Sequence, residues 1–117
     1  MTARNEAHAI TVTPTKGRVQ VKFGGQVIAT TVRALGVQDG SNPPVQYILR
    51  EDTQMALLER TTLKTGCAYK GEASYFSIRA GGKFVENAVW SYEMPPAEFS
   101  EIAGRLAFYM VDSIDVE

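Results

Sequence analysis

Hydrophobic and polar side chains alternate strictly along residues 18–23, where a valine or phenylalanine stands at every second position. A period of two residues predicts a strand that is buried on one face. The next apolar run, residues 27–32, is rich in β-branched side chains and follows the pair Gly24-Gly25. Because a tight type I′ turn needs positive φ at both central residues, this pair predicts a hairpin between the two runs.

A second hairpin is predicted where Gly81-Gly82 separates residues 69–79 from residues 84–92. If these glycines form a two-residue turn, the side chains of Tyr75, Trp90 and Tyr92 share one face of the hairpin. The residues that this register sets opposite the three aromatic side chains are small: Ala88, Ala73 and Gly71. Large and small side chains in this arrangement either interdigitate in a core or leave a concave aromatic floor.

The pattern between and beyond the hairpins predicts shorter elements. Residues 34–45 are rich in Gly, Asp, Ser, Asn and Pro and are expected to form a loop, followed by a short strand over residues 46–49. Asp52 is expected to cap a short helix that places Met55 and Leu58 on one face. A further strand is expected over residues 61–65.

The C-terminal part of the chain predicts one more helix and one more strand. Pro95-Pro96 is typical of a first helical turn, and Gly104 is typical of a helix end. Residues 106–111 form the last predicted strand, and the pair Asp112 and Asp115 is expected in a solvated tail. Residues 1–15 lack a period and are expected to form a loose N-terminal tail before a single β-rich domain over residues 16–117.

These elements favour a mainly β fold class. Seven or eight strands, two short helices and no strand–helix–strand spacing favour an antiparallel system in one small domain over a doubly wound parallel sheet. A chain of 117 residues has the length of one domain and can bury a core without disulfides.

Charge and composition exclude several kinds of partner and site. A formal net charge of −1 argues against a nucleic-acid-binding face, and no apolar run has the length of a membrane helix. The single cysteine, Cys67, and the single histidine, His8, cannot build a zinc site of several thiolates or imidazoles. We therefore expect no metal and no cofactor, and the absence of a secretory segment predicts a cytoplasmic protein.

Five blocks of the chain stand in a specific order and spacing. They are Gly17-Arg18-Val19 with Gly25-x-Val27-x-Ala29, Tyr47-x-x-Arg50-Glu51-Asp52, Cys67-x-x-Lys70-Gly71-x-Ala73-Ser74-Tyr75, Glu86-Asn87-x-x-Trp90-x-Tyr92-x-x-Pro95 and Phe108-Tyr109. In these blocks the chain resembles domain-of-unknown-function family 427, and the resemblance covers about residues 14–112. It implies a small tent-like β fold, and the label nucleotidyltransferase-like that the family sometimes carries finds no clustered carboxylates or phosphate loop here.

The chain departs from the family pattern beside its cysteine and its Arg-Glu-Asp block. Gly66 and Ala68 flank Cys67 where the family often has histidine and proline, and Leu49 stands where it usually has proline. Cys67 consequently lacks a neighbouring base that would generate a thiolate, and a small buried hydrophobe is its simplest interpretation.

Seven residues in these blocks are the candidate ligand-binding residues because they combine aromatic surface with a few charges, which is typical of a small-molecule pocket. Each also has a structural interpretation. Asp52 fits a helix cap, Lys70 fits an ion pair with Glu93 across the hairpin, and the aromatic side chains fit a core. The seven are Arg50, Asp52, Lys70, Ser74, Tyr75, Trp90 and Tyr92.

Three functional hypotheses remain open at this point. The first is a binding module whose pocket, formed by the second hairpin, holds a small polar or anionic ligand, with Lys70 or Arg50 contacting its charge. The second is an enzyme of unknown reaction in which Asp52 is the base and Lys70 stabilises charge, which requires that the two groups lie close together. The third is a homodimerising or protein-interaction module that uses a sheet edge or an apolar patch.

Overall fold

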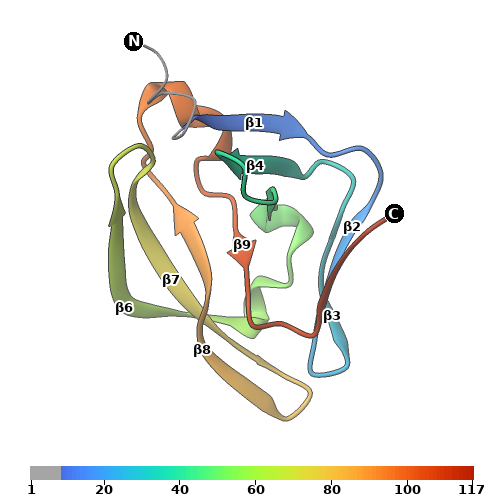
Figure 1. Ribbon diagram of the computed structural model, residues 1–117. Coiled ribbons are helices and arrows are strands. Elements are labelled where there is room, and N and C mark those ends of the chain that lie inside the picture. Colours follow the sequence, from blue (N-terminus) through green and yellow to red (C-terminus); the bar gives the residue numbers. More distant parts are fainter. Residues whose placement is uncertain (1–8) are drawn as a thin grey trace.

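Three antiparallel sheets make up the fold of the computed structural model, which describes residues 9–117 (Figure 1). The first sheet has the order β1-β4-β5 and the second the order β10-β2-β3. The third is the largest, with the order β6-β7-β8-β9. The strands are β1 (Ile10–Pro14), β2 (Val19–Phe23), β3 (Gln26–Thr31), β4 (Leu35–Asp39), β5 (Val45–Tyr47), β6 (Leu58–Cys67), β7 (Gly71–Ala80), β8 (Lys83–Tyr92), β9 (Ala107–Phe108) and β10 (Ser113–Val116).

The mainly β, antiparallel prediction is confirmed, and both predicted hairpins are present. Gly24 and Gly25 join β2 to β3 and have positive φ, as do Gly81 and Gly82 between β7 and β8. The two turns also lie against each other. A Cβ atom on Gly24 would collide with the Ala80 carbonyl group, and one on Gly81 would collide with the backbone of Gly24. Glycine is therefore needed there both for φ and for close packing.

The register of the second hairpin differs from the predicted one by two residues beyond a bulge. Near the turn, Ala80 faces Lys83 as expected, but past Ile78 the partner of Tyr75 is Trp90, not Ala88. Asn87, at φ 55°, lies in the irregular segment that takes up the extra residues of β8. A shift of two residues preserves the face of every side chain. The shared aromatic face therefore survives, with Tyr75 opposite Trp90 and Tyr92 opposite Ala73.

Two segments that were predicted to be irregular are strands. Residues 10–14 of the expected tail form β1, which pairs with β4 inside the expected loop over residues 34–45. Both segments do alternate, with Ile10 and Val12 in one and Leu35 and Val37 in the other, but each alternating run is short and lies next to residues typical of turns and loops, so the pairing was missed. The rest of the predicted tail, residues 1–8, lies outside the described residues.

The C-terminal prediction needs a similar correction. The last predicted strand is reduced to β9. Asp115 is exposed, as expected, but it lies in β10, which pairs with β2, and not in a tail. The structured helices of the described chain are short 3₁₀ segments: η1 (Arg50–Asp52), η2 (Met55–Leu57) and η3 (Ala97–Ile102). Leu58 begins β6, so it does not share a helix with Met55. None of these helices has the length and apolarity to cross a lipid bilayer.

The core consists of two clusters of apolar side chains, and the large sheet contributes to both. Phe76, Ile78 and Val89 lie in the first cluster, together with the valines of β2. Ala73 and Tyr92 lie in the second cluster, against which Tyr75 and Trp90 pack. Successive side chains of a strand point to opposite faces, so β7 and β8 present different surfaces on their two sides.

Candidate functional site

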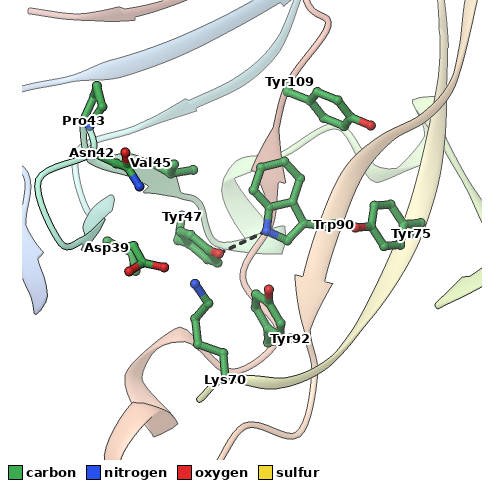
Figure 2. A pocket seen from close by; sticks show the side chains of 11 residues that line it. Asp39, Asn42, Pro43, Val45, Tyr47, Lys70, Tyr75, Trp90, Tyr92 and Tyr109 are labelled. Atoms are coloured by element: carbon green, nitrogen blue, oxygen red, sulfur yellow. Dashed lines mark hydrogen bonds between the residues drawn. The ribbon is translucent and has the colours of Figure 1, made fainter. Parts of the chain in front are cut away.

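A pocket of about 400 Å³ opens between the large sheet and the strands β4 and β5 (Figure 2). This volume lies within the range of small-molecule sites. Strands β4 and β5 and their connecting loop form one side, and side chains from β7, β8 and the segment after β9 form the other. The lining residues are Val37, Asp39, Asn42, Pro43, Val45, Tyr47, Lys70, Tyr75, Trp90, Tyr92 and Tyr109.

Aromatic side chains form most of the pocket wall and hold one another in place. The Trp90 indole donates a hydrogen bond from Nε1 to the Tyr47 hydroxyl at 3.0 Å (Figure 2). The Tyr47 ring stacks on the Tyr92 ring at 6.5 Å between centroids, and Tyr109 meets Trp90 edge-on at 5.5 Å. Tyr47 is 1% exposed, so this part of the wall is as fixed as the core.

The two innermost phenols remain protonated at physiological pH. Burial raises the pKa of Tyr47 to about 12, and burial is also the main cause that raises the pKa of Tyr92. A protonated phenol both donates and accepts hydrogen bonds. The wall therefore carries no charge of its own and offers polar hydroxyl groups within an apolar surface.

Lys70 supplies a positive charge inside this aromatic pocket. It lies in the turn between β6 and β7, is 9% exposed, and directs its ammonium group toward the space in front of Tyr47 and Tyr92 (Figure 2). Its Nζ atom is 5.4 Å from the centre of the Tyr92 ring. Within the described residues the ammonium forms a cation–π contact but no ion pair with a carboxylate.

The predicted ion pair between Lys70 and Glu93 is wrong. The two-residue shift in register moves Glu93 away from Lys70, and Glu93 instead accepts hydrogen bonds from Arg50, Arg60 and Ser74. We refer to these four residues as the Glu93 cluster. Arg60 is the main cause that lowers the pKa of Glu93 to about 2, although partial burial opposes this shift.

Two predicted site residues, Arg50 and Ser74, thus belong to the Glu93 cluster and not to the pocket. The Arg50 guanidinium also donates from Nε to the Gly104 carbonyl group at 2.7 Å, and Ser74 accepts a hydrogen bond from Lys64 at 2.8 Å. Ser74 precedes Tyr75 on β7, so its side chain points to the opposite face of the sheet. Both side chains therefore already bond to charged neighbours within the protein.

Asp52 also lies elsewhere, and it does not cap a helix. Neither η1 nor η2 has a side-chain cap. The Asp52 carboxylate accepts a hydrogen bond from the Thr31 hydroxyl at 2.7 Å and pairs with Arg33 at 3.1 Å. The Thr31 hydrogen bond is the main cause that lowers its pKa. Asp52 lines a separate shallow hollow beside β3, whereas Lys70 lines the aromatic pocket.

The structure brings Lys70, Tyr75, Trp90 and Tyr92 together in one pocket, as the sequence predicted for these four. Sequence reasoning missed the opposite wall. Tyr47 and Tyr109 stand in the blocks that carry the family resemblance, and that signal was available. Nothing local marked the pocket residues of the β4–β5 region, since that segment reads as a loop: Val37, Asp39, Asn42, Pro43 and Val45.

Cysteine and metal chemistry have no obvious place at this site. Cys67 is half-buried and packs against the second core cluster, in line with its interpretation as a small hydrophobe. In residues 9–117, no three His, Cys, Asp or Glu side chains gather in an arrangement that would hold a metal ion.

Comparison with known protein families gives one match. The family model described as "Domain of unknown function (DUF427)" matches residues 11–117, nearly the whole chain. No curated protein matches the chain.

Proposed function

The chain belongs to the DUF427 family of domains of unknown function, and we propose a function from its pocket. The protein is a binding module for a small molecule that combines an anionic group with a flat or apolar body. The second hairpin supplies Lys70's neighbours Tyr75, Trp90 and Tyr92, and β4 and β5 supply the opposite wall. The single observation that carries the proposal is the position of Lys70: the residue is only 9% exposed, and its ammonium group faces the pocket without a carboxylate partner among the described residues.

The surroundings of Lys70 leave its charge only partly solvated and without a counter-charge among the described residues, which is unfavourable. Transfer of an ammonium group from water into a protein interior is unfavourable unless an opposite charge or strong hydrogen bonds compensate for it. The cation–π contact with Tyr92 supplies only about 0.5–2 kcal/mol. An anionic group of a ligand would complete the coordination of Lys70, so a carboxylate or phosphate is the chemistry that fits this position.

The aromatic wall supports the same conclusion for the rest of the ligand. Tyr47, Trp90 and Tyr92 offer large, rigid apolar surfaces whose positions are fixed by mutual packing and by the Trp90–Tyr47 hydrogen bond. Such surfaces bind flat or apolar groups with little loss of side-chain entropy. The phenol hydroxyl groups add hydrogen-bonding capacity for polar atoms of the ligand.

We do not propose an enzyme that uses Asp52 and Lys70 at one reacting bond. That hypothesis requires both groups at the same substrate, and they line different hollows. Homodimerisation stays a prediction, which analytical ultracentrifugation of the full chain would test.

A thermal-shift screen tests the proposed function. Wild type, Lys70→Met and the control Lys83→Met, which changes an exposed lysine at the tip of the second hairpin, are screened against nucleotides, aromatic and aliphatic carboxylates, amino acids and neutral sugars. A ligand at about one hundred times its Kd stabilises the fold by about 2.7 kcal/mol, which raises Tm by roughly 10 °C for a domain of this size. We expect anionic compounds to stabilise wild type and Lys83→Met but not Lys70→Met. Stabilisation by neutral compounds alone, equal in all three proteins, would contradict the proposal.

A further inference from the structure

The pocket contains a second charge of opposite sign. Asp39 is the last residue of β4, and its carboxylate faces the same space as the Lys70 ammonium group (Figure 2). Asp39 is exposed at the edge of the pocket, whereas Lys70 is buried within it. Asp39 comes from β4 and Lys70 from the turn between β6 and β7, and the two side chains form no ion pair with each other among the described contacts. The pocket therefore presents two charges of opposite sign that form no ion pair with each other and face the same space beside the aromatic wall (Figure 2).

We propose that the ligand is a zwitterion of the amino-acid type, whose carboxylate binds Lys70, whose ammonium group binds Asp39, and whose apolar side chain packs against Tyr47, Trp90 and Tyr92. This inference rests on the proposed function and narrows its ligand class. It adds a second specificity-determining residue, Asp39, to the pocket.

Charge complementarity favours a zwitterion over a ligand of one sign. A purely anionic ligand at Lys70 would lie close to the Asp39 carboxylate, and a purely cationic ligand at Asp39 would lie close to the Lys70 ammonium group. Like charges close together in a partly desolvated site are unfavourable. A ligand with both charges pairs with each group, so each protein charge selects one end of the ligand.

The difference in exposure predicts how the two charges contribute. Lys70 is buried, so the hydrogen bond of its ammonium group to a carboxylate is shielded from water and contributes more to affinity. Asp39 is exposed, so its ion pair is screened by solvent and contributes less. The carboxylate end of the ligand should therefore dominate affinity, and the ammonium end should mainly decide selectivity.

Trp90 provides an internal reporter of occupancy. It is the only tryptophan in the chain and lies in the pocket wall, next to the rings of Tyr47 and Tyr109. Ligands without an indole group leave its emission as the only tryptophan signal. The fluorescence of the full-length protein can thus be titrated directly.

The test is a series of matched ligands on the wild-type protein. Leucine, methionine and phenylalanine are each titrated beside the analogue that lacks the amino group and the analogue that lacks the carboxylate, for example 3-phenylpropionate and 2-phenylethylamine for phenylalanine. For at least one side chain, we expect the amino acid to bind about three- to fivefold more tightly than the deaminated analogue and more than tenfold more tightly than the decarboxylated one. This comparison does not depend on the folding of any variant.

Variants then assign each end of the ligand. Asp39→Asn should abolish the preference for the amino acid over its deaminated analogue, whereas Glu86→Gln, which removes an exposed carboxylate outside the pocket, should leave it unchanged. Lys70→Met should raise the Kd of the amino acid by more than tenfold. Lys70→Arg, which keeps the positive charge, should raise this Kd by a smaller factor. Near-ultraviolet circular dichroism shows whether each variant retains the packed aromatic wall.

The outcomes separate the inference from the function on which it rests. If deaminated analogues bind as tightly as amino acids, or if no amino acid binds while other anions still require Lys70, the zwitterion inference is overturned and the anion-binding function stands. If neither amino acids nor any anion of the wider screen binds, both are overturned.

Discussion

The aromatic pocket and the Glu93 cluster lie on opposite faces of the same two strands, β7 and β8. They differ in whether their charged side chains have partners of opposite charge. In the Glu93 cluster, two guanidinium groups and a serine hydroxyl surround one carboxylate, with distances of 2.7 to 3.0 Å. Both guanidinium groups also lie over the Phe76 ring, at 5.5 and 4.9 Å. In the pocket, Lys70 and Asp39 have no such partners among the described residues.

This difference distinguishes a structural cluster from a candidate binding site. The charge of Glu93 is compensated by side chains of the protein itself, so its contribution appears in the free energy of unfolding. Within residues 9–117, the ammonium group of Lys70 has a cation–π contact with the Tyr92 ring and no ion pair, so its contribution should appear when a ligand binds. The residue types of the two sites are similar, and only their partners separate them.

The largest expected effect concerns the pocket wall, because it is also part of the core. Tyr47→Ala should lower the free energy of unfolding by about 3–5 kcal/mol, since it removes a fully buried aromatic ring that packs against Trp90 and Tyr92. Urea unfolding measures this loss. A loss below about 1 kcal/mol would mean that the Tyr47 ring is not rigidly packed and that this pocket wall is not part of the core.

Glu93→Gln should destabilise the protein by about 1–2 kcal/mol at neutral pH. The variant keeps the size of the side chain but removes the charge between Arg50 and Arg60. Glu72→Gln, an exposed carboxylate on β7 outside the cluster, is the matched control and should change stability by less than about 0.5 kcal/mol. Equal effects of the two substitutions would show that the Glu93 cluster contributes no more than surface charge.

The same contribution should depend on pH in a defined direction. The pKa of Glu93 is lowered from 4.5 to about 2 in the folded protein, so its stabilisation is fully present above the unfolded pKa and is lost as pH falls toward about 2. The stability difference between wild type and Glu93→Gln should be constant above about pH 5 and vanish near pH 2. Unfolding curves at a series of pH values measure it, and a difference that persists at pH 2 would contradict the assignment.

Tyr47→Phe should have a smaller effect, about 1 kcal/mol, because it keeps the ring and removes only the hydroxyl group that accepts the Trp90 hydrogen bond. The emission maximum of Trp90 should shift as its Nε1–H loses this partner. Tyr109→Phe serves as the control, since Tyr109 contacts the Trp90 ring but does not accept its hydrogen bond. Identical spectra for wild type and Tyr47→Phe would contradict the interaction.

Lys70→Met should change stability least, by no more than about 0.5 kcal/mol. The lost cation–π contact is offset because an apolar side chain of similar length replaces a buried charge. Lys83→Met gives the baseline for an exposed lysine. A loss of 2 kcal/mol or more in Lys70→Met would place Lys70 among the structural residues, beside Glu93, and remove the contrast between the two faces.

The sequence predicted one wall of the pocket because the residues of that wall lie close together in the chain. Tyr75, Trp90 and Tyr92 lie on one hairpin whose glycine turn and period of two residues can be read directly, and the two-residue bulge left their common face intact. Arg50 and Ser74, which were grouped with the aromatic residues, do not line the same pocket. Composition grouped them with Lys70, although alternation along β7 sends Ser74 and Tyr75 to opposite faces.

The opposite wall of the pocket required the tertiary structure. Asp39 lies at the end of β4, which pairs with β1 and β5. The alternation of β4 covers only a few residues and runs directly into a segment rich in Gly, Ser, Asn and Pro, so the local pattern alone indicated a loop. The separation of Lys70 from Glu93 likewise depended on the bulge at Asn87, which turn chemistry does not encode.

By itself, the sequence determined the mainly β class, both glycine hairpins and the aromatic face, because turn geometry and side-chain alternation act over a few neighbouring residues. Only the tertiary structure decided which charges have partners. Glu93 meets Arg50 and Arg60 from distant segments, whereas Lys70 and Asp39 face one cavity without pairing. Pairing depends on distances of a few ångströms between distant parts of the chain, and those distances are set by packing.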